Sequence, residues 1–166
     1  MTLFKTTDEQ RVQCAVIAVA MKTAGLPTNF IAGWLELADH DKGMFELGEL
    51  WHEESSEEER DELVVAIQEL LDEAAELPNR TVEKPRMSFD QLDEVAEAII
   101  EHKRKLRETI DRDHGGVSAA AAKIGMPQPS LSRFLSSASM PRRSTLYRIA
   151  RGLGLDEAEI VTEWVR

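Results

Sequence analysis

Residues 118–137, SAAAAKIGMPQPSLSRFLSS, contain the feature that most restricts the fold of this chain. An alanine-rich segment ends at Gly125, and a segment with leucine and phenylalanine at helical spacing follows it. Glycine adopts a positive φ angle without steric cost, so it can end one helix and turn the chain sharply into the next. The stretch therefore predicts two short helices that pack against each other across a tight turn at Gly125.

The positions of the small and apolar residues fit a helix-turn-helix. Ala121 is small enough to let a second helix cross closely, and Gly125 follows it at the turn four residues later. Apolar residues occupy the positions at which the two helices would bury one another: Ala120, Ile124, Met126, Leu131 and Phe134. Because Pro127 and Pro129 both suit a first helical turn, we predict that the second helix covers residues 128–136.

Polar side chains lie on the outward side of this predicted second helix: Gln128, Ser130, Ser132, Arg133 and Ser136. Their hydroxyl, amide and guanidinium groups can reach base edges and phosphates without blocking close approach to a duplex. These residues indicate binding of double-stranded DNA. The alternative is an ordinary helical hairpin in which Gly125 only ends a helix.

The charge of the chain is unevenly distributed. The formal net charge of −11 is unfavourable for binding a polyanion, but residues 1–79 hold 5 Lys+Arg against 18 Asp+Glu, whereas residues 101–151 hold 11 against 4. The predicted helix-turn-helix therefore lies in the basic part of the chain, which would attract phosphates. Such an asymmetry predicts two modules with different partners.

Helical periodicity extends over most of the chain and predicts an all-α fold with two domains. Residues 1–78 are predicted to form a small acidic helical domain that dimerises or binds a partner protein. Within it, residues 12–24 are apolar on nearly every side, so we expect this helix to be covered all round, at the centre of the domain or at a subunit interface. The aperiodic segment 79–88 is predicted to be a linker, and residues 89–166 to be the DNA-binding domain.

A long helix is predicted to lead into the second domain and to end at about Asp113. The apolar residues of its inward face are Leu92, Val95, Ala96, Ile99, Leu106 and Ile110. The basic segment 102–107 interrupts this face at Lys103, where the helix would exchange one packing partner for another. The patch from Lys103 to Arg107 is compatible with a solvated helix face or with contacts to phosphate.

Two stretches of the second domain resemble known families. Residues 106–135 are similar to the Fis-type helix-turn-helix of bacterial regulators in the pair Gly115–Gly116, the alanine-rich first helix and the Ser-Leu-Ser-Arg run. Residues 136–164 are similar to the fourth and fifth helices of Cro/phage-repressor-like (XRE-type) domains, at Thr145, Leu146, Ile149, Ala150, Leu153 and Leu155. Over residues 103–164 the resemblance implies a five-helix, lambda-repressor-like domain of a bacterial transcription regulator.

The resemblance also implies which side chains would meet DNA. The base-proximal residues would be Gln128, Ser130, Ser132 and Arg133, of which Gln128 would favour adenine, and Arg133 guanine or a nearby phosphate. The DNA backbone would be lined by Ser118, as the N-cap of the first helix, together with Lys123, Ser139, Arg142, Arg143 and Tyr147. Because a single module of this kind binds weakly, we expect a homodimer that binds two half-sites.

The sequence offers little support for catalysis. It contains no HExxH, no paired cysteines, no G-x-S-x-G and no P-loop, so we expect neither an enzyme, nor a cofactor, nor a metal site. The sequence contains a single cysteine, Cys14, and the apolar run 14–21 is too short to span a bilayer. We therefore expect a cytoplasmic protein with no membrane partner.

A second class of function competes with DNA binding. Under this alternative the protein is an interaction or adaptor module, or an antitoxin-type autorepressor, and residues 1–78 bind a partner protein. The apolar character of residues 12–24 favours an interface in this domain. The positive charge and polar outward face of residues 128–136 favour a retained DNA-binding role in the other.

Overall fold

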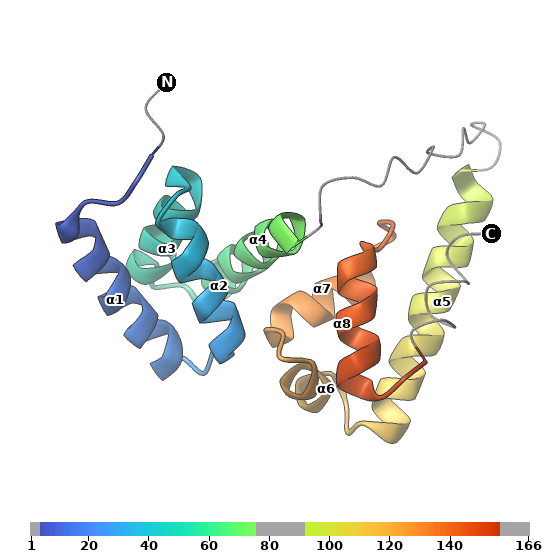
Figure 1. The fold of residues 1–166 in the computed structure, drawn as a ribbon. Helices are drawn as coiled ribbons and strands as arrows, with labels where there is room; N and C mark the ends of the chain where they lie inside the picture. The colour runs from blue at the N-terminus through green and yellow to red at the C-terminus, as the bar shows by residue number, and fades with distance from the viewer. Residues whose placement is uncertain (1–3, 76–91, 157–166) are drawn as a thin grey trace. The chain divides into compact units, whose positions relative to one another are not determined.

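The computed structural model describes residues 4–75 and 92–156, and all regular secondary structure in these two ranges is helical (Figure 1). The helices are α1 (Asp8–Thr23), α2 (Thr28–Ala38), α3 (Lys42–Glu53), α4 (Glu57–Ala75), α5 (Leu92–Asp113), α6 (Val117–Ile124), α7 (Gln128–Ser136) and α8 (Arg143–Leu153). The predicted all-α fold class is thereby confirmed. The predicted linker 79–88 and the fifth helix expected for the second domain lie outside the described residues.

The chain divides into two compact units. The first is built on α1–α4 and the second on α5–α8, with the short segment Gly125–Ser130 grouped with the first. None of the described helices is long and apolar enough to cross a membrane.

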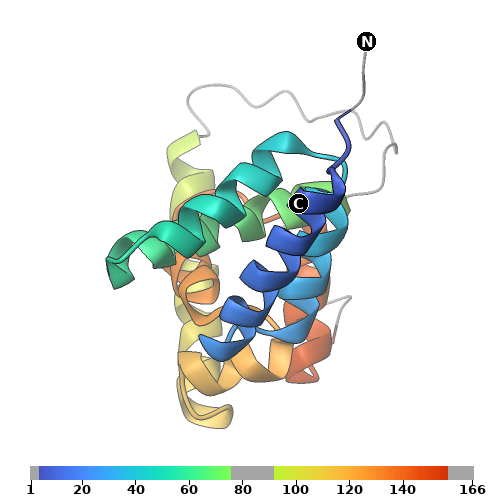
Figure 2. The same ribbon diagram turned by 90° about the vertical axis from the view of Figure 1, so that its left-hand side faces the viewer.

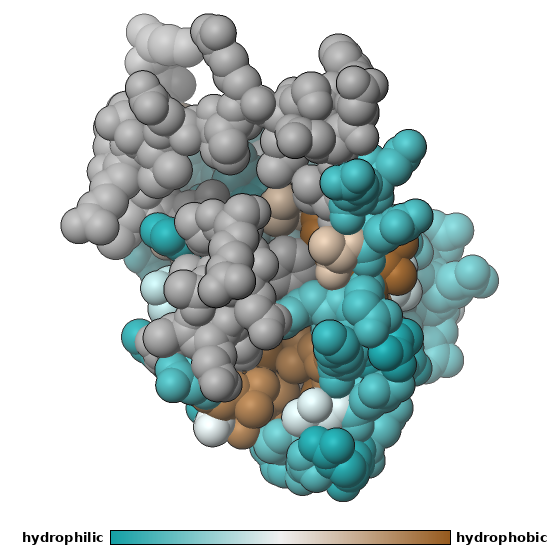
Figure 3. All heavy atoms as spheres, turned by 90° about the vertical axis from the view of Figure 1, so that its right-hand side faces the viewer, coloured by the Kyte–Doolittle hydropathy of each residue, from teal (hydrophilic) through white to brown (hydrophobic). Residues whose placement is uncertain are grey.

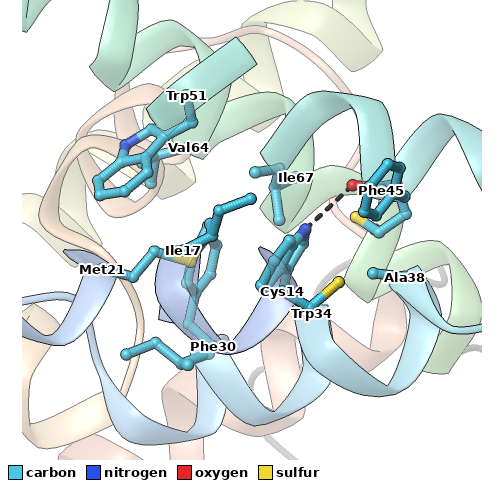
Figure 4. Close-up of a cluster of buried hydrophobic side chains, with 12 residues drawn as sticks. Cys14, Ile17, Met21, Phe30, Trp34, Ala38, Phe45, Trp51, Val64 and Ile67 are labelled. Carbon is cyan, nitrogen blue, oxygen red and sulfur yellow. Dashed lines mark hydrogen bonds between the residues drawn. The ribbon is translucent and has the colours of Figure 1, made fainter. Parts of the chain in front are cut away.

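The core of the first unit surrounds Trp34 (Figure 4). This side chain of α2 is fully buried, and its indole N–H donates a hydrogen bond to the backbone carbonyl of Met44 in α3 at 3.0 Å. Ile17 of α1 and Ile67 of α4 complete the packing from two further helices. Gly48 of α3 lies against the ring, where a Cβ atom would be only 2.1 Å from Trp34 Cζ2. The close approach of α3 to α2 therefore depends on the missing side chain.

Helix α1 is covered on one side only. Cys14, Ile17 and Met21 face the core, where α2 and α3 pack against α1. Val12 and Val19, on the other side of the helix, are each about two-thirds exposed. The alternative that residues 12–24 form a central helix of the domain is therefore wrong, because the described partners of α1 lie on the same side of it. The other alternative, a subunit interface, stays a prediction.

The second unit is organised around the apolar faces of α5 and α8. Ile99, Leu106 and Ile110 of α5 are buried as predicted, whereas the side chains of Leu92 and Val95 lie outside the described residues. Seen from the side of α5, most of the visible described surface is hydrophilic, with a smaller hydrophobic area (Figure 3). The buried face of α8 consists of Thr145, Leu146, Ile149, Ala150 and Leu153, all of which are positions of the resemblance.

Helix α6 packs against both α5 and α8. At its contact with α8 the backbones meet closely, because a Cβ atom on Gly152 would lie 2.6 Å from Ile124 Cα. Gly154 then ends α8 in the left-handed conformation, with φ at 66°, and the Leu155 N–H donates to the carbonyl of Ala150. These contacts fix the position of α6, the helix that precedes the turn.

Candidate nucleic-acid interface

The turn between α6 and α7 has the geometry that the sequence predicts. Helix α6 ends at Ile124, Gly125 has a φ angle of 75°, and α7 begins at Gln128. Ala121, the small residue expected at the helix crossing, is buried. The helix-turn-helix is thus formed by α6, Gly125 and α7. The bounds of α7 are those predicted for the second helix.

Two buried leucines anchor one side of α7. Leu131 is fully buried, and Leu135, one helical turn later, is also buried. Phe134 is half-buried and packs against Leu146 and Ala150 of α8. Leu135 was not among the predicted anchors, although its spacing of four residues from Leu131 is the signal that could have found it.

The four predicted base-proximal residues differ in their exposure to solvent. Gln128 and Arg133 are exposed, and Ser132 is half-buried. Ser130 is only 8% exposed, and its hydroxyl has no hydrogen-bond partner among the described residues. Because positions three and four apart share a helix face, Ser132, Arg133 and the exposed Ser136 form one outward stripe, with Gln128 at the start of the helix. Ser130 does not belong to this stripe.

The residues predicted to line the DNA backbone come from several elements. Lys123 near the end of α6, Arg143 at the start of α8, and Ser118 and Ser139 are exposed, whereas Arg142 and Tyr147 are half-buried. Ser118 is not the N-cap of α6, which corrects the prediction. The helix already begins at Val117, because Gly116 turns the chain into it with a φ angle of 91°. Ser118 therefore lies within the first turn.

The basic residues of the second unit differ in whether they are ion-paired. On α5, Arg104 is bound by Glu101 at 2.7 Å and also by Glu108, and Arg112 pairs with Asp113 at 2.8 Å. The hydrogen bond from Arg112 lowers the pKa of Asp113 and so keeps this carboxylate charged. Lys123, Arg133 and Arg143, in contrast, form no ion pair with any residue that the structure describes. The cations available to an external anion thus include one each from α6, α7 and α8.

Lys103 has a role that the sequence did not indicate. It is 1% exposed, and its ammonium donates to the backbone carbonyls of Ser137 at 2.7 Å and Ser139 at 3.0 Å. The Ser137 hydroxyl accepts a third hydrogen bond at 3.2 Å, and the ammonium lies 4.7 Å from the ring centroid of Phe134. Lys103 is therefore neither on a solvated helix face nor available to phosphate. It holds the segment that follows α7 against α5.

The inward face of α5 accordingly continues through Lys103 and is not interrupted there. Ile99, Lys103, Leu106 and Ile110 are spaced four, three and four residues apart, which is the spacing of a single helix face. Of the rest of the basic patch, Arg104, Lys105 and Arg107 are exposed. The spacing alone could have placed Lys103 on the buried face, but its acceptors are supplied by residues more than thirty positions away in the sequence.

The buried ammonium makes the stability of the second unit depend on pH. Burial lowers the pKa of Lys103 from 10.5 to about 8. Between about pH 8 and pH 10.5 the folded protein therefore binds fewer protons than the unfolded chain, and its free energy of unfolding rises with pH. This contribution to stability is complete above pH 10.5 and is lost as the pH falls through about 8. Relative to a Lys103→Met variant, we expect the native chain to become more stable with rising pH in this interval, by up to about 1.4 kcal/mol per pH unit.

Urea unfolding of both proteins across this interval would measure the effect, with α5 and α8 followed by hydrogen exchange and mass spectrometry. The variant controls for all other titrating groups, since only position 103 differs. A stability difference that is independent of pH would contradict the prediction.

A comparison with protein families agrees with this geometry. Residues 111–160 match the family model described as helix-turn-helix, a segment that starts near the end of α5 and contains α6, α7 and α8. This match agrees with the resemblance of the segment to XRE-type helix-turn-helix domains. The family is one of DNA-binding domains and not of catalytic domains. No curated protein and no solved structure matches the chain.

The described residues offer no metal centre, since no three His, Cys, Asp or Glu side chains among them are grouped so that they could hold an ion. The helix-turn-helix presents hydrogen-bond donors and acceptors on the outward side of α7, together with Lys123, Arg133 and Arg143, which form no ion pair with a described residue.

Proposed function

We propose that the protein is a bacterial transcription regulator that binds DNA sequence-specifically and inserts α7 into the major groove. The observation that carries this proposal is the division of α7 into two sides. Leu131 and Leu135 anchor one side, while the exposed Arg133 and Ser136 and the half-buried Ser132 lie on the other. An α-helix fits into the major groove of B-DNA, where each base pair has a distinct pattern of donors and acceptors.

In this proposal Arg133 is the principal base-contacting residue. Its guanidinium is exposed and has no ion-pair partner within the described parts of the chain, so no internal interaction has to be broken when it meets guanine or phosphate. Gln128, exposed at the start of α7, would contact adenine through its amide. Ser132 and Ser136 are short enough to let the helix approach the base edges. Ser130 is left out of this set because it is buried.

The remaining exposed polar residues would contact the DNA backbone. Lys123 and Arg143 carry the charge, and Ser118 and Ser139 supply hydroxyl groups. Arg142 is the N-cap of α8 and Arg143 is its first residue, so the positive end of the helix dipole would add to the attraction of both side chains for phosphate. These contacts would fix the orientation of α7 on the duplex without selecting the sequence.

The proposed working form is a homodimer that acts in the cytoplasm. One helix-turn-helix unit buries little surface, whereas two units related by a two-fold axis would bind two half-sites and add their binding free energies. The acidic residues 1–78 would be repelled by phosphates, which favours an orientation away from the duplex and weakens binding to unrelated sequences.

An Arg133→Ala variant tests the proposal. High-affinity sites would first be selected from a random DNA library with the full chain, and affinities for the selected and scrambled duplexes would then be measured at one salt concentration. We expect the variant to lose about 1–3 kcal/mol of binding free energy on the selected site and little on scrambled DNA, because a bidentate contact to a base is lost. An equal loss on both duplexes would mean that Arg133 contacts phosphate, which contradicts the assignment.

The matched control is Arg104→Ala. It removes the same charge from the same unit, but from a guanidinium that Glu101 and Glu108 already hold. We expect this variant to bind both duplexes nearly as the native chain does. Failure of the native chain to prefer any DNA sequence over random DNA would overturn the proposed function itself.

A further inference from the structure

Three valines form an exposed stripe on α1, here called the valine face: Val12, Val16 and Val19, which are 66%, 52% and 65% exposed. Figure 2 looks toward the side of the first unit on which α1 lies. The valines are four and three residues apart and so follow one another along a single face of the helix. This face is opposite the core-facing side of Cys14, Ile17 and Met21. Single exposed apolar residues are common, but a continuous stripe of them on one helix indicates a binding surface.

The charge of α1 differs from that of the unit to which it belongs. Helix α1 contains Asp8, Glu9, Arg11 and Lys22, two acidic and two basic residues, and so has no net charge. Helix α4 in contrast holds eight acidic residues and one arginine. Two copies of this acidic unit would repel each other across α4 but not across α1. The valine face is therefore a surface through which two acidic units can approach without a large electrostatic cost.

The order of the charges along α1 also defines the direction of pairing. Asp8 and Glu9 are in the first turn, where Arg11 pairs with Asp8 at 3.3 Å, so this end keeps one net negative charge, and Lys22 is in the last turn. If two α1 helices pack antiparallel, the acidic end of each lies beside the basic end of the other, and their helix dipoles also oppose each other favourably. A parallel arrangement would bring like charges together at both ends.

We infer that the valine face is the contact between two copies of this chain, which pair their α1 helices antiparallel about a two-fold axis close to Val16. Val12 of one copy then lies opposite Val19 of the second copy, and the same surface serves both copies, as a closed two-fold dimer requires. The inference rests on the proposed function, because a regulator that binds two half-sites needs such a dimer. It assigns the dimer contact to one helix of the first unit.

The oligomeric state of the full chain, measured without DNA by sedimentation equilibrium, tests this inference. We expect the native chain to be a dimer, and Val16→Glu to raise the dimer dissociation constant at least about 100-fold, because two carboxylates would meet in a dry contact near the axis. Since Val16 is exposed in the single chain, the variant should keep its fold, which circular dichroism and thermal unfolding would verify.

The control variant is Leu50→Glu. Leu50 is an apolar residue of α3 in the same unit, and it is 54% exposed, close to the value for Val16. It receives the same charge on a different helix, outside the valine face, so its dimer dissociation constant should remain within a few fold of the native value. A native chain that stays monomeric at every concentration, or a Val16→Glu variant that dimerises as Leu50→Glu does, would overturn the inference.

Cysteine cross-linking tests the direction of pairing. In the antiparallel dimer the two residues at position 16 lie within reach of a disulfide, whereas the two residues at position 12 are separated by about 10 Å along the helices, since each residue advances about 1.5 Å. Val16→Cys should therefore form a cross-linked dimer on oxidation and Val12→Cys should not, with the native chain, whose Cys14 is buried, as the control. Efficient cross-linking through Val12→Cys would contradict the antiparallel arrangement.

These outcomes are independent of DNA binding. If Val16→Glu dissociates the dimer while the native chain fails to select any DNA sequence, the dimer contact stands and the proposed function fails. If the chain is monomeric but selects a DNA site, the proposed function stands and the assignment of the valine face fails.

Discussion

Replacement of Trp34 by alanine is expected to lower the free energy of unfolding of the first unit by about 3–5 kcal/mol, the range found for large aromatic residues removed from a core. Trp34 is fully buried, so its loss leaves a cavity among α1, α2, α3 and α4. The carbonyl of Met44 also loses the hydrogen bond from the indole N–H. Since domains are stable by only about 5–15 kcal/mol, this loss is a large part of the total.

Hydrogen exchange followed by mass spectrometry is the appropriate measurement, because it reports on each helix separately. Exchange should accelerate throughout α1–α3 of the Trp34→Ala variant. The neighbouring Leu35→Ala is the control, since Leu35 is partly exposed and its removal should change exchange little. Similar exchange in the two variants would show that the tryptophan is not the centre of this core.

Replacement of Gly152 by alanine is expected to destabilise the second unit by about 3 kcal/mol, the upper part of the usual range for overpacking. The new Cβ would lie 2.6 Å from Ile124 Cα, which is a backbone atom and cannot rotate away. Helices α6 and α8 would have to separate, and the helix-turn-helix that begins with α6 would lose its support. This cost exceeds the gain of about 1 kcal/mol that alanine brings as a better helix former.

Chemical unfolding of the second unit and DNA affinity should both respond to Gly152→Ala. Gly33→Ala provides the comparison, because its Cβ would meet only the end of the Leu71 side chain, at 3.0 Å, and this side chain can move. We expect the Gly33→Ala variant to keep most of its stability and its DNA affinity. Equal stability losses in the two variants would show that the backbone contact between α6 and α8 is not decisive.

The helix-turn-helix could be predicted from the sequence because its determinants are local. The bounds of α7 and the positive φ angle of Gly125 follow from a glycine, two prolines and apolar residues at helical spacing, all within twenty residues. The buried face of α8 was predictable for the same reason. Local signals of this kind act within one or two helical turns, and they need no knowledge of distant parts of the chain.

The side chains that were assigned incorrectly or incompletely depend on distant contacts. Ser130 lies within a polar stretch, yet it is buried, whereas its neighbours Ser132 and Arg133 are not. Ser118 lies inside α6 because Gly116 starts the helix earlier than a serine cap would. Periodicity predicts which residues share a face, but the depth of that face depends on the helices that cover it.

By itself, the sequence determined the helical class of the described residues, the turn at Gly125 and the separation of an acidic part from a basic part, because these properties follow from backbone preferences and from charge. Only the tertiary structure decided that Lys103 is buried against Ser137 and Ser139, that Arg104 is occupied by carboxylates while Arg133 is not, and that one side of α1 is left uncovered. The physical reason is that the burial and pairing of a side chain are fixed by groups far away in the sequence, and those groups come together only when the helices pack.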